Sequence, residues 1–92
     1  MQTAIMLIAL ASTAPGVEEA MKRLGPAYMC APAYEYRLAL KALEHELEAI
    51  GVPDLLAGFA VSGVDDYIKR EQSDKAASIT AEECAAKYGV IR

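Results

Sequence analysis

Two cysteines, Cys30 and Cys84, and a single histidine, His45, have the greatest capacity for chemistry in this sequence. Cys30 and His45 could form a nucleophile–base pair, because a thiolate becomes reactive when an imidazole takes its proton. The pair also needs a third group to orient the imidazole, and the sequence marks out none. A small enzyme that uses Cys30 and His45 therefore stays an alternative without a catalytic motif behind it.

His45 lies in the run Glu44-His45-Glu46-Leu47-Glu48, which resembles a zinc-binding helix only in part. That motif needs a second histidine four positions on, so that both imidazoles face one metal, and position 49 is alanine. Phosphate-binding glycine loops, serine-nucleophile elbows and C-x-x-C pairs do not occur. We therefore expect no catalytic residue, no metal site and no cofactor, and we predict that the protein is not an enzyme.

The cysteines also bear on the cellular compartment. They lie far apart and do not form a disulfide framework, so we interpret them as reduced, small, buried apolar residues, with one disulfide as the alternative. The apolar run from Ala4 to Ala11 has about the length of a signal-peptide core, but no Lys or Arg precedes it. It is also shorter than the roughly 20 residues that span a bilayer. The sequence thus predicts a cytoplasmic protein without membrane contact.

Tyrosines and paired carboxylates are the candidates for contact with a partner protein. Tyrosine combines contact area with a polar tip, although the same rings could instead cover the core where helices meet. The carboxylate pairs fall in predicted first helical turns, where the helix dipole already favours them, and an acidic recognition surface is the alternative. Of Tyr28, Tyr34 and Tyr36, Tyr34 is expected to be the most exposed. The candidate partner-binding residues are Tyr28, Tyr34, Asp65, Asp66, Glu82 and Glu83.

Length and charge limit the classes of function. A chain of 92 residues is expected to form a single helical domain, residues 1–92, whose composition of 54% hydrophobic residues argues against disorder. Thirteen acidic and nine basic residues give a net charge of −4, and Lys and Arg never cluster beyond the pairs at 22–23 and 69–70. Nucleic-acid binding depends on clustered cations, so it is not expected. A partner with a basic surface suits the negative charge better.

Proline, glycine and apolar spacing predict the elements. The clearest helix runs from about 32 to 50, because five apolar residues repeat at intervals of four and three and place one stripe on its surface. These are Tyr36, Leu40, Leu43, Leu47 and Ile50. A capping box at Thr80–Glu83 starts a last helix that Gly89 closes.

Shorter helices are predicted over 15–24, ended by Gly25-Pro26, over 53–61, ended by Ser62-Gly63, and over 64–72, followed by a loop at 73–79. Residues 2–11 are interpreted as a buried core helix, or alternatively as a strand paired across a dimer. The fold class is therefore all-α, a small bundle of four to six short helices around one long central helix at about 32–50.

Residues 80–90 resemble the first helix and turn of a helix-turn-helix module. A recognition helix would have to follow, and only Ile91 and Arg92 remain, so a DNA-associated regulator is an alternative function. The main prediction is a non-catalytic protein-binding module, a small inhibitor or adaptor of the kind that phages and mobile elements encode, which covers part of a partner's surface. We also expect the apolar surplus of so small a bundle to favour a homodimer.

Overall fold

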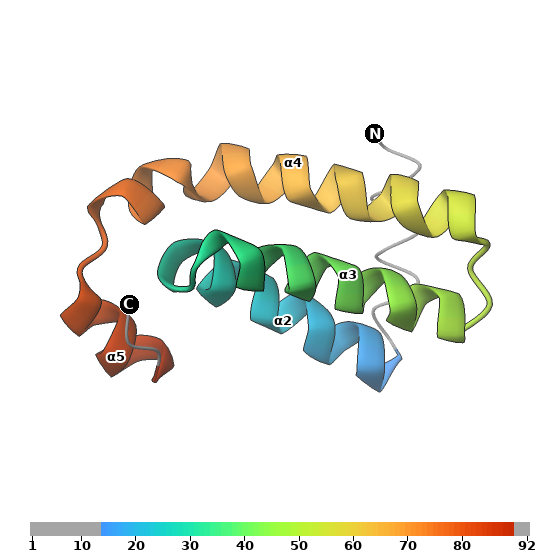
Figure 1. Cartoon of the computed structure of the whole chain (residues 1–92), viewed down its shortest axis with the longest axis horizontal. Coiled ribbons are helices and arrows are strands. Elements are labelled where there is room, and N and C mark those ends of the chain that lie inside the picture. The colour runs from blue at the N-terminus through green and yellow to red at the C-terminus, as the bar shows by residue number, and fades with distance from the viewer. Residues whose placement is uncertain (1–13, 90–92) are drawn as a thin grey trace.

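The fold is all-α, as predicted. The structure is a computed structural model that describes residues 14–89, and within that range it contains four helices and no strand (Figure 1). The helices are α2 (Pro15–Cys30), α3 (Ala33–Ala49), α4 (Asp54–Ser78) and α5 (Ala81–Tyr88). The predicted core element at 2–11 lies outside the described residues. None of the helices within 14–89 combines the length and the apolar character that crossing a bilayer requires.

Three helices form the body, and α5 is attached at one end. α3 lies between α4 and α2 in the view of Figure 1, and α2 packs against all three of the other helices. The expected arrangement around one central helix is therefore only loosely supported. The 32–50 helix packs against both α2 and α4, but the longest helix is α4, with 25 residues.

The core follows the apolar stripes of the three long helices. Leu43 and Leu47 of α3 are completely buried, as is Val17 of α2, because residues three and four apart share one helix face. The buried residues of α4 are Ile68 and two alanines, Ala57 and Ala60, whose small side chains let the backbone of α4 come close. The main cluster consists of Val17, Ala20, Leu24, Tyr36, Leu43, Leu47, Ala57, Ala60 and Ile68.

The prediction for α3 is confirmed in its bounds and in most of its stripe. Pro32 precedes the helix, and Gly51 follows its C-cap with a φ of 97°, a left-handed conformation that glycine adopts without steric cost. Ile50 departs from the predicted stripe. It is 46% exposed, because it is the C-cap residue and lies past the last turn that faces the core.

The predicted end of the first helix at Gly25-Pro26 is wrong. α2 continues through Pro26 to Cys30, although proline lacks the N–H that would bond to the carbonyl four residues earlier. The buried residues Leu24, Met29 and Cys30 lie on both sides of the proline. Burial of apolar side chains beyond Pro26 therefore offsets the cost of the interior proline, and the segment from 26 to 30 belongs to the helix.

The predicted break at Ser62-Gly63 is also wrong. One uninterrupted helix replaces the two short helices and the loop expected between 53 and 79. Gly58 and Gly63 each cost a helix only about 1 kcal/mol, whereas ending the helix would remove Ala60 and Ile68 from the core. Gly58 also fits a close approach, since a Cβ there would lie 3.2 Å from a carboxylate oxygen of Glu44.

The last helix begins and ends where the sequence predicts. The Thr80 hydroxyl accepts a hydrogen bond from the backbone N–H of Glu83 at 3.1 Å, and Gly89 ends the helix with a φ of 70°. The prediction of two reduced cysteines is wrong, because Cys30 and Cys84 form a disulfide. Their Cα atoms are 5.7 Å apart, because α5 folds back onto the end of α2 and brings together residues that are 54 positions apart in sequence.

Candidate protein-binding surface

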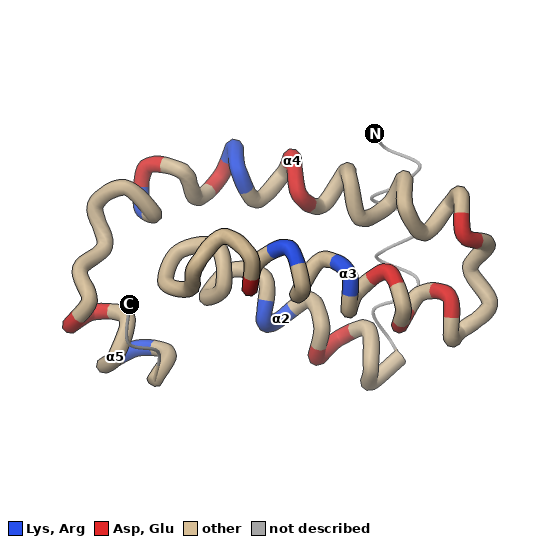
Figure 2. The backbone as a smooth tube through the Cα atoms, viewed as in Figure 1, with Lys and Arg blue, Asp and Glu red and all other residues tan. Residues whose placement is uncertain are grey.

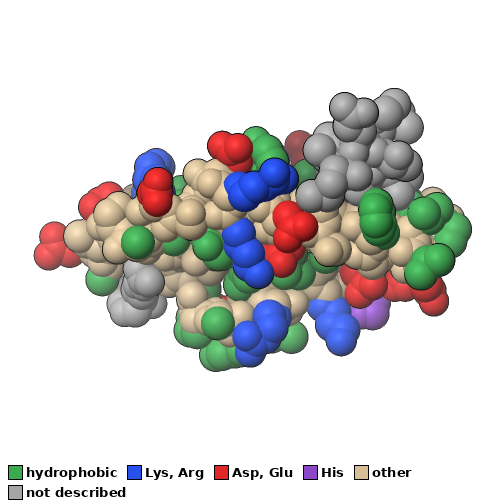
Figure 3. All heavy atoms as spheres, turned by 90° about the horizontal axis from the view of Figure 1, so that it is seen from above, with side chains coloured by type: hydrophobic (Ala, Val, Ile, Leu, Met, Phe, Trp, Pro, Cys, Tyr) green, Lys and Arg blue, Asp and Glu red, His purple; other side chains and the backbone are tan. Residues whose placement is uncertain are grey.

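Large apolar side chains are exposed at the end of the molecule where α3 turns into α4. We call Ile50, Leu55, Leu56 and Phe59 the apolar end patch. Leu55 is 86% exposed and Phe59 is 54% exposed, whereas an interior leucine such as Leu43 is completely buried. In Figure 3 hydrophobic side chains gather at this right-hand end, next to acidic ones. A concentration of exposed apolar side chains of this kind is typical of contact surfaces.

The patch arises because the first turns of α4 are apolar on every side. Residues 55–61 read Leu-Leu-Ala-Gly-Phe-Ala-Val, without one polar side chain. Ala57 and Ala60 face the core, so helical geometry directs positions 55, 56 and 59 to the other sides. Leu55 and Phe59, four residues apart, share a face, and so do Leu56 and Phe59, three residues apart. The core does not use this part of the apolar surface.

Carboxylates border the patch along the contact between α3 and α4. We call Glu44, Glu48 and Asp54 the acidic seam. Asp54 at the start of α4 lies near enough to Glu48 of α3 to raise its pKa, and the carboxylate of Glu44 lies against Gly58. The hydrogen bond with Asp54, desolvation and the nearby charges of Asp54 and Glu44 raise the pKa of Glu48, and His45 acts in the opposite direction. Like charges are thus held close together beside the apolar end patch, because Asp54 directly precedes Leu55 and Gly58 directly precedes Phe59 in the chain.

The charge of this end has one sign. Between Lys41 and Lys69 the chain contains six acidic residues and no Lys or Arg. Figure 2 accordingly shows red and no blue where α3 ends and α4 begins. The acidic residues are Glu44, Glu46, Glu48, Asp54, Asp65 and Asp66.

The candidate tyrosines have different environments. Tyr28 is partly buried, and its ring meets the ring of Tyr36 edge to face with 5.2 Å between centroids, so it covers the core at the helix junction. Tyr34 is 56% exposed, as expected, and its hydroxyl donates to Glu35 at 3.5 Å. Of the two candidate tyrosines, only Tyr34 is therefore accessible to a partner to any large extent.

The carboxylate of Asp65 already has two partners within the fold. Its carboxylate accepts a hydrogen bond of 2.7 Å from the hydroxyl of Tyr36 and pairs with Lys69 at 3.1 Å. Burial, followed by the hydrogen bond and the charge of Asp65, raises the pKa of Tyr36 above its usual value of 10.0. The sequence-based reason for Asp65, the start of a helix, is also wrong, because it lies in the interior of α4.

Asp66, Glu82 and Glu83 are exposed. Asp66 lies in the middle of α4, and the two glutamates lie in the first turn of α5, where Glu83 takes part in the cap with Thr80. The six candidates are therefore spread over the four described helices. The apolar end patch was not predicted from the sequence, although the run of apolar residues without helical periodicity at 55–61 was an available signal.

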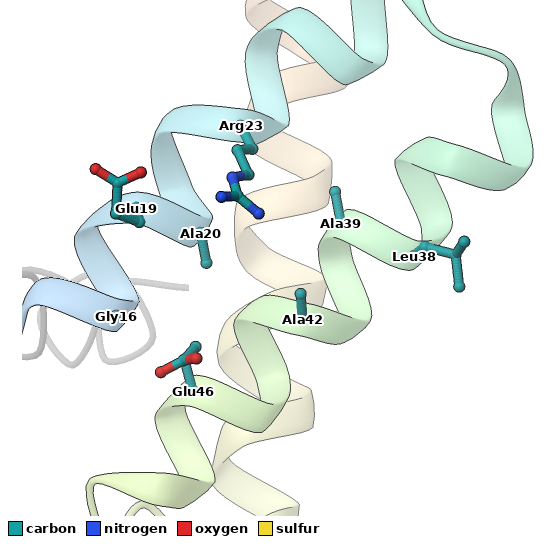
Figure 4. A pocket seen from close by; sticks show the side chains of 8 residues that line it. All are labelled: Gly16, Glu19, Ala20, Arg23, Leu38, Ala39, Ala42 and Glu46. Atoms are coloured by element: carbon teal, nitrogen blue, oxygen red, sulfur yellow. The ribbon is translucent and has the colours of Figure 1, made fainter.

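A shallow groove between α2 and α3 is a separate, concave feature of the molecule (Figure 4). It encloses about 360 Å³, with alanines on its floor and charged side chains around it. α2 and α3 come close together here. A Cβ on Gly16 would collide with the carboxylate of Glu46. The lining holds no cysteine, histidine or hydroxyl group. Its residues are Gly16, Glu19, Ala20, Arg23, Leu38, Ala39, Ala42 and Glu46.

The most reactive side chains, those of Cys30, Cys84 and His45, do not form a site together. The sulfur of Cys30 is bonded to Cys84 and completely buried, so a thiolate there would require reduction of the disulfide. The His45 side chain is 73% exposed, and its Nδ1 lies 3.9 Å from Glu48. Within residues 14–89, no three His, Cys, Asp or Glu side chains are grouped so that they could hold a metal ion.

Comparison of the chain with protein-family models, with curated protein sequences and with solved structures found no match. A functional proposal therefore depends on the chemistry and geometry of the surface itself.

Proposed function

We propose that the chain is a non-catalytic protein-binding module, a small inhibitor or adaptor that covers part of a partner through the apolar end patch. The observation that carries the proposal is the exposure of Leu55, Leu56 and Phe59 on consecutive turns of one helix. Large apolar side chains, aromatic ones above all, dominate the binding energy at the centres of protein interfaces. A rigid helix face also loses little conformational entropy when a partner covers it.

Site-specific crosslinking tests this proposal. A photoreactive amino acid at position 55 should form a covalent product with one protein in the native host, whereas the same probe at position 38 should not. Leu38 is the matched control, since it is 61% exposed but belongs to α3, away from the patch. A second variant, Leu55→Ser with Phe59→Ser, should lose capture of that protein while its thermal unfolding stays within a few degrees of the native chain. Equal products at positions 55 and 38 would refute the proposed surface.

A competing prediction places the contact at Tyr34 and Asp66, and the same assay separates it from the apolar end patch. Both side chains are exposed. Tyr34→Ala together with Asp66→Ala should leave capture through position 55 unchanged. If that double variant alone loses the partner, the contact surface is the one expected from the tyrosines and carboxylates.

The disulfide bears on where the module acts. A cytoplasmic location was expected from the sequence on the assumption of reduced cysteines, and structural disulfides persist mainly in oxidising compartments. We propose that the working form of the protein carries the Cys30–Cys84 bond. Alkylation of whole cells before lysis, followed by a non-reducing gel, should show both cysteines protected. Two alkylated thiols would instead favour the reduced, cytoplasmic form.

A further inference from the structure

The apolar end patch adjoins a surface of one charge, and this restricts what can cover it. Any partner that contacts Leu55 and Phe59 comes close to the carboxylates of Asp54, Glu48 and Glu44. Burying those carboxylates next to an uncharged surface would cost free energy, because they would lose water without gaining a counter-charge. The region from 42 to 68 supplies no Lys or Arg of its own.

From this arrangement we propose that the apolar end patch and the acidic seam together bind a segment of another protein that presents apolar side chains flanked by Lys or Arg, such as a basic amphipathic helix. The inference rests on the proposed function and adds the chemistry of the partner. The apolar side chains would contact Leu55, Leu56 and Phe59. The cations would lie over Glu44, Glu48 and Asp54.

The closeness of the carboxylates in the acidic seam supports this choice of partner. Asp54 and Glu44 lie near enough to Glu48 to raise its pKa, so the carboxylates repel one another when they are ionised. An ammonium or guanidinium group offers these carboxylates several donors and a positive charge. A cation bound there can therefore offset the repulsion.

A second copy of this chain is a poorer occupant. In a two-fold symmetric dimer the same surface lies on both sides of the interface. Each apolar end patch would then bring its own acidic seam next to the seam of the other copy, and like charges would oppose each other across the contact. The homodimer expected from the sequence is therefore the competing outcome of the test.

Three synthetic peptides of about 18 residues test the inference, since such a peptide forms about five helical turns. The first has a leucine face flanked by lysines, the second has glutamate in place of every lysine, and the third keeps the lysines but has glutamine in place of every leucine. Titration calorimetry with the full disulfide-bonded chain gives the three dissociation constants. The first peptide should bind at least tenfold more tightly than either of the others. Equal binding of the lysine and glutamate peptides, or no binding of the first peptide at millimolar concentration, would overturn the inference.

Four variants localise the binding. Leu55→Ser with Phe59→Ser should abolish binding of the first peptide, whereas Tyr34→Ser with Leu38→Ser, which removes equally exposed apolar groups elsewhere, should not change it. Glu48→Gln with Asp54→Asn should weaken binding by about threefold to tenfold, as expected for two surface charge pairs. Glu71→Gln with Glu82→Gln makes the same change of charge at exposed sites outside the seam and should have less than half that effect on the binding free energy. Equal weakening by the two charge variants would overturn the role of the acidic seam.

Two further results separate this inference from the proposed function. If position 55 crosslinks to a host protein while the lysine and glutamate peptides bind alike, the binding module stands and the basic partner does not. If analytical ultracentrifugation shows a dimer that Leu55→Ser with Phe59→Ser dissociates, the occupant is a second copy and the inference is overturned.

Discussion

The hydroxyl of Tyr36 and the carboxylate of Asp65 join α3 to α4 by a hydrogen bond of 2.7 Å at the edge of the core. Tyr36 is only 7% exposed, so little water is available to replace it as a donor. Loss of the Tyr36 hydroxyl would leave the carboxylate of Asp65 with Lys69 as its remaining partner. A hydrogen bond to a charged acceptor in such a place contributes more than one between neutral groups on the surface.

Tyr36→Phe should therefore lower the free energy of unfolding by about 1–2 kcal/mol, because the variant removes the hydroxyl and keeps the ring. Urea unfolding followed by circular dichroism measures the change. Tyr34→Phe is the control, since the Tyr34 hydroxyl is exposed and its hydrogen bond to the neighbouring Glu35 is long, at 3.5 Å. The effect of this variant should be below about 0.5 kcal/mol. Equal stability of the two variants would show that the Tyr36 hydroxyl does not hold α3 to α4.

Glu48 should give the stability of the protein a recognisable pH dependence. Its pKa is raised in the folded state by Asp54 on α4, by desolvation and by Glu44, against the effect of His45. The folded state then binds more protons than the unfolded state between the ordinary pKa of 4.5 and the raised value, so stability falls as pH rises through that interval. Below pH 4.5 this contribution is constant, and at neutral pH the folded state carries the repulsion in full.

Glu48→Gln should accordingly be more stable than the native chain at pH 7 and equal to it at pH 4. Urea unfolding at the two pH values measures the difference, and 1 M salt should reduce it at pH 7 because exposed charges are screened. Glu71→Gln, an exposed position away from the acidic seam, should show no such change with pH. A variant that is less stable than the native chain at pH 7 would contradict the assigned repulsion.

At the scale of single residues, the sequence predicted the role of some side chains and not of others. The cap at Thr80 and the glycine at 89 were predictable because both depend on bonds between neighbours in the chain. The binding roles considered for Tyr28 and Asp65 depended on exposure. Tyr28 packs against a ring of α3, and Asp65 bonds to a hydroxyl of α3, so their burial is a property of helix packing that local spacing does not contain.

Among the elements, α3 was predictable and the ends of α2 and α4 were not. The apolar stripe of α3 is regular, and Pro32 and Gly51 mark its ends. Pro26 and Gly63 carry the same local signals, but tertiary packing overrides them, since Met29 and Cys30 lie beyond one and Ile68 lies beyond the other. Signals for a helix end are reliable where the apolar pattern also stops, and in α2 and α4 it continues.

Pro26 should therefore destabilise a helix that other contacts maintain. Pro26→Ala adds the missing N–H and removes the ring from the helix interior, so we expect the free energy of unfolding to rise by about 1–3 kcal/mol. Chemical denaturation compared with Pro32→Ala provides the control, because Pro32 lies outside the helices as the N-cap of α3 and should change stability by less than about 1 kcal/mol. A loss of stability in Pro26→Ala would show that the proline ring contributes packing that alanine cannot replace.

For the whole molecule, the disulfide is the strongest restraint on α5. Among the residues of α5, only Cys84 is buried, and this helix packs mainly against α2. Met29, Cys30, Ile79 and Cys84 form a small separate cluster around the bond. The sequence left one disulfide as an alternative but could not show that the two cysteines meet, because proximity across 54 positions arises only from the complete chain path.

Cys30→Ala with Cys84→Ala should lower the free energy of unfolding by about 2–4 kcal/mol, because the cross-link no longer restricts the unfolded chain. Thermal unfolding with and without a reductant measures this, and the reductant should affect the native chain but not the variant. Amide hydrogen exchange should increase first in α5 and leave α3 protected. Uniform loss of protection would show that α5 is not a separate unit held by the bond.

The same bond divides the polypeptide into a closed covalent ring and two tails. Residues 30–84 form the ring, so a protease that cuts once inside α3 or α4 leaves a single molecule until a reductant is added. A force applied to the chain ends would be transmitted through the disulfide and would not stretch the residues of the ring. Extending 54 residues would otherwise release about 180–190 Å of contour length, so a stretched native molecule should be shorter than its reduced form by nearly that amount. The surface proposed for binding lies wholly within this ring, shielded from tension that the tails transmit.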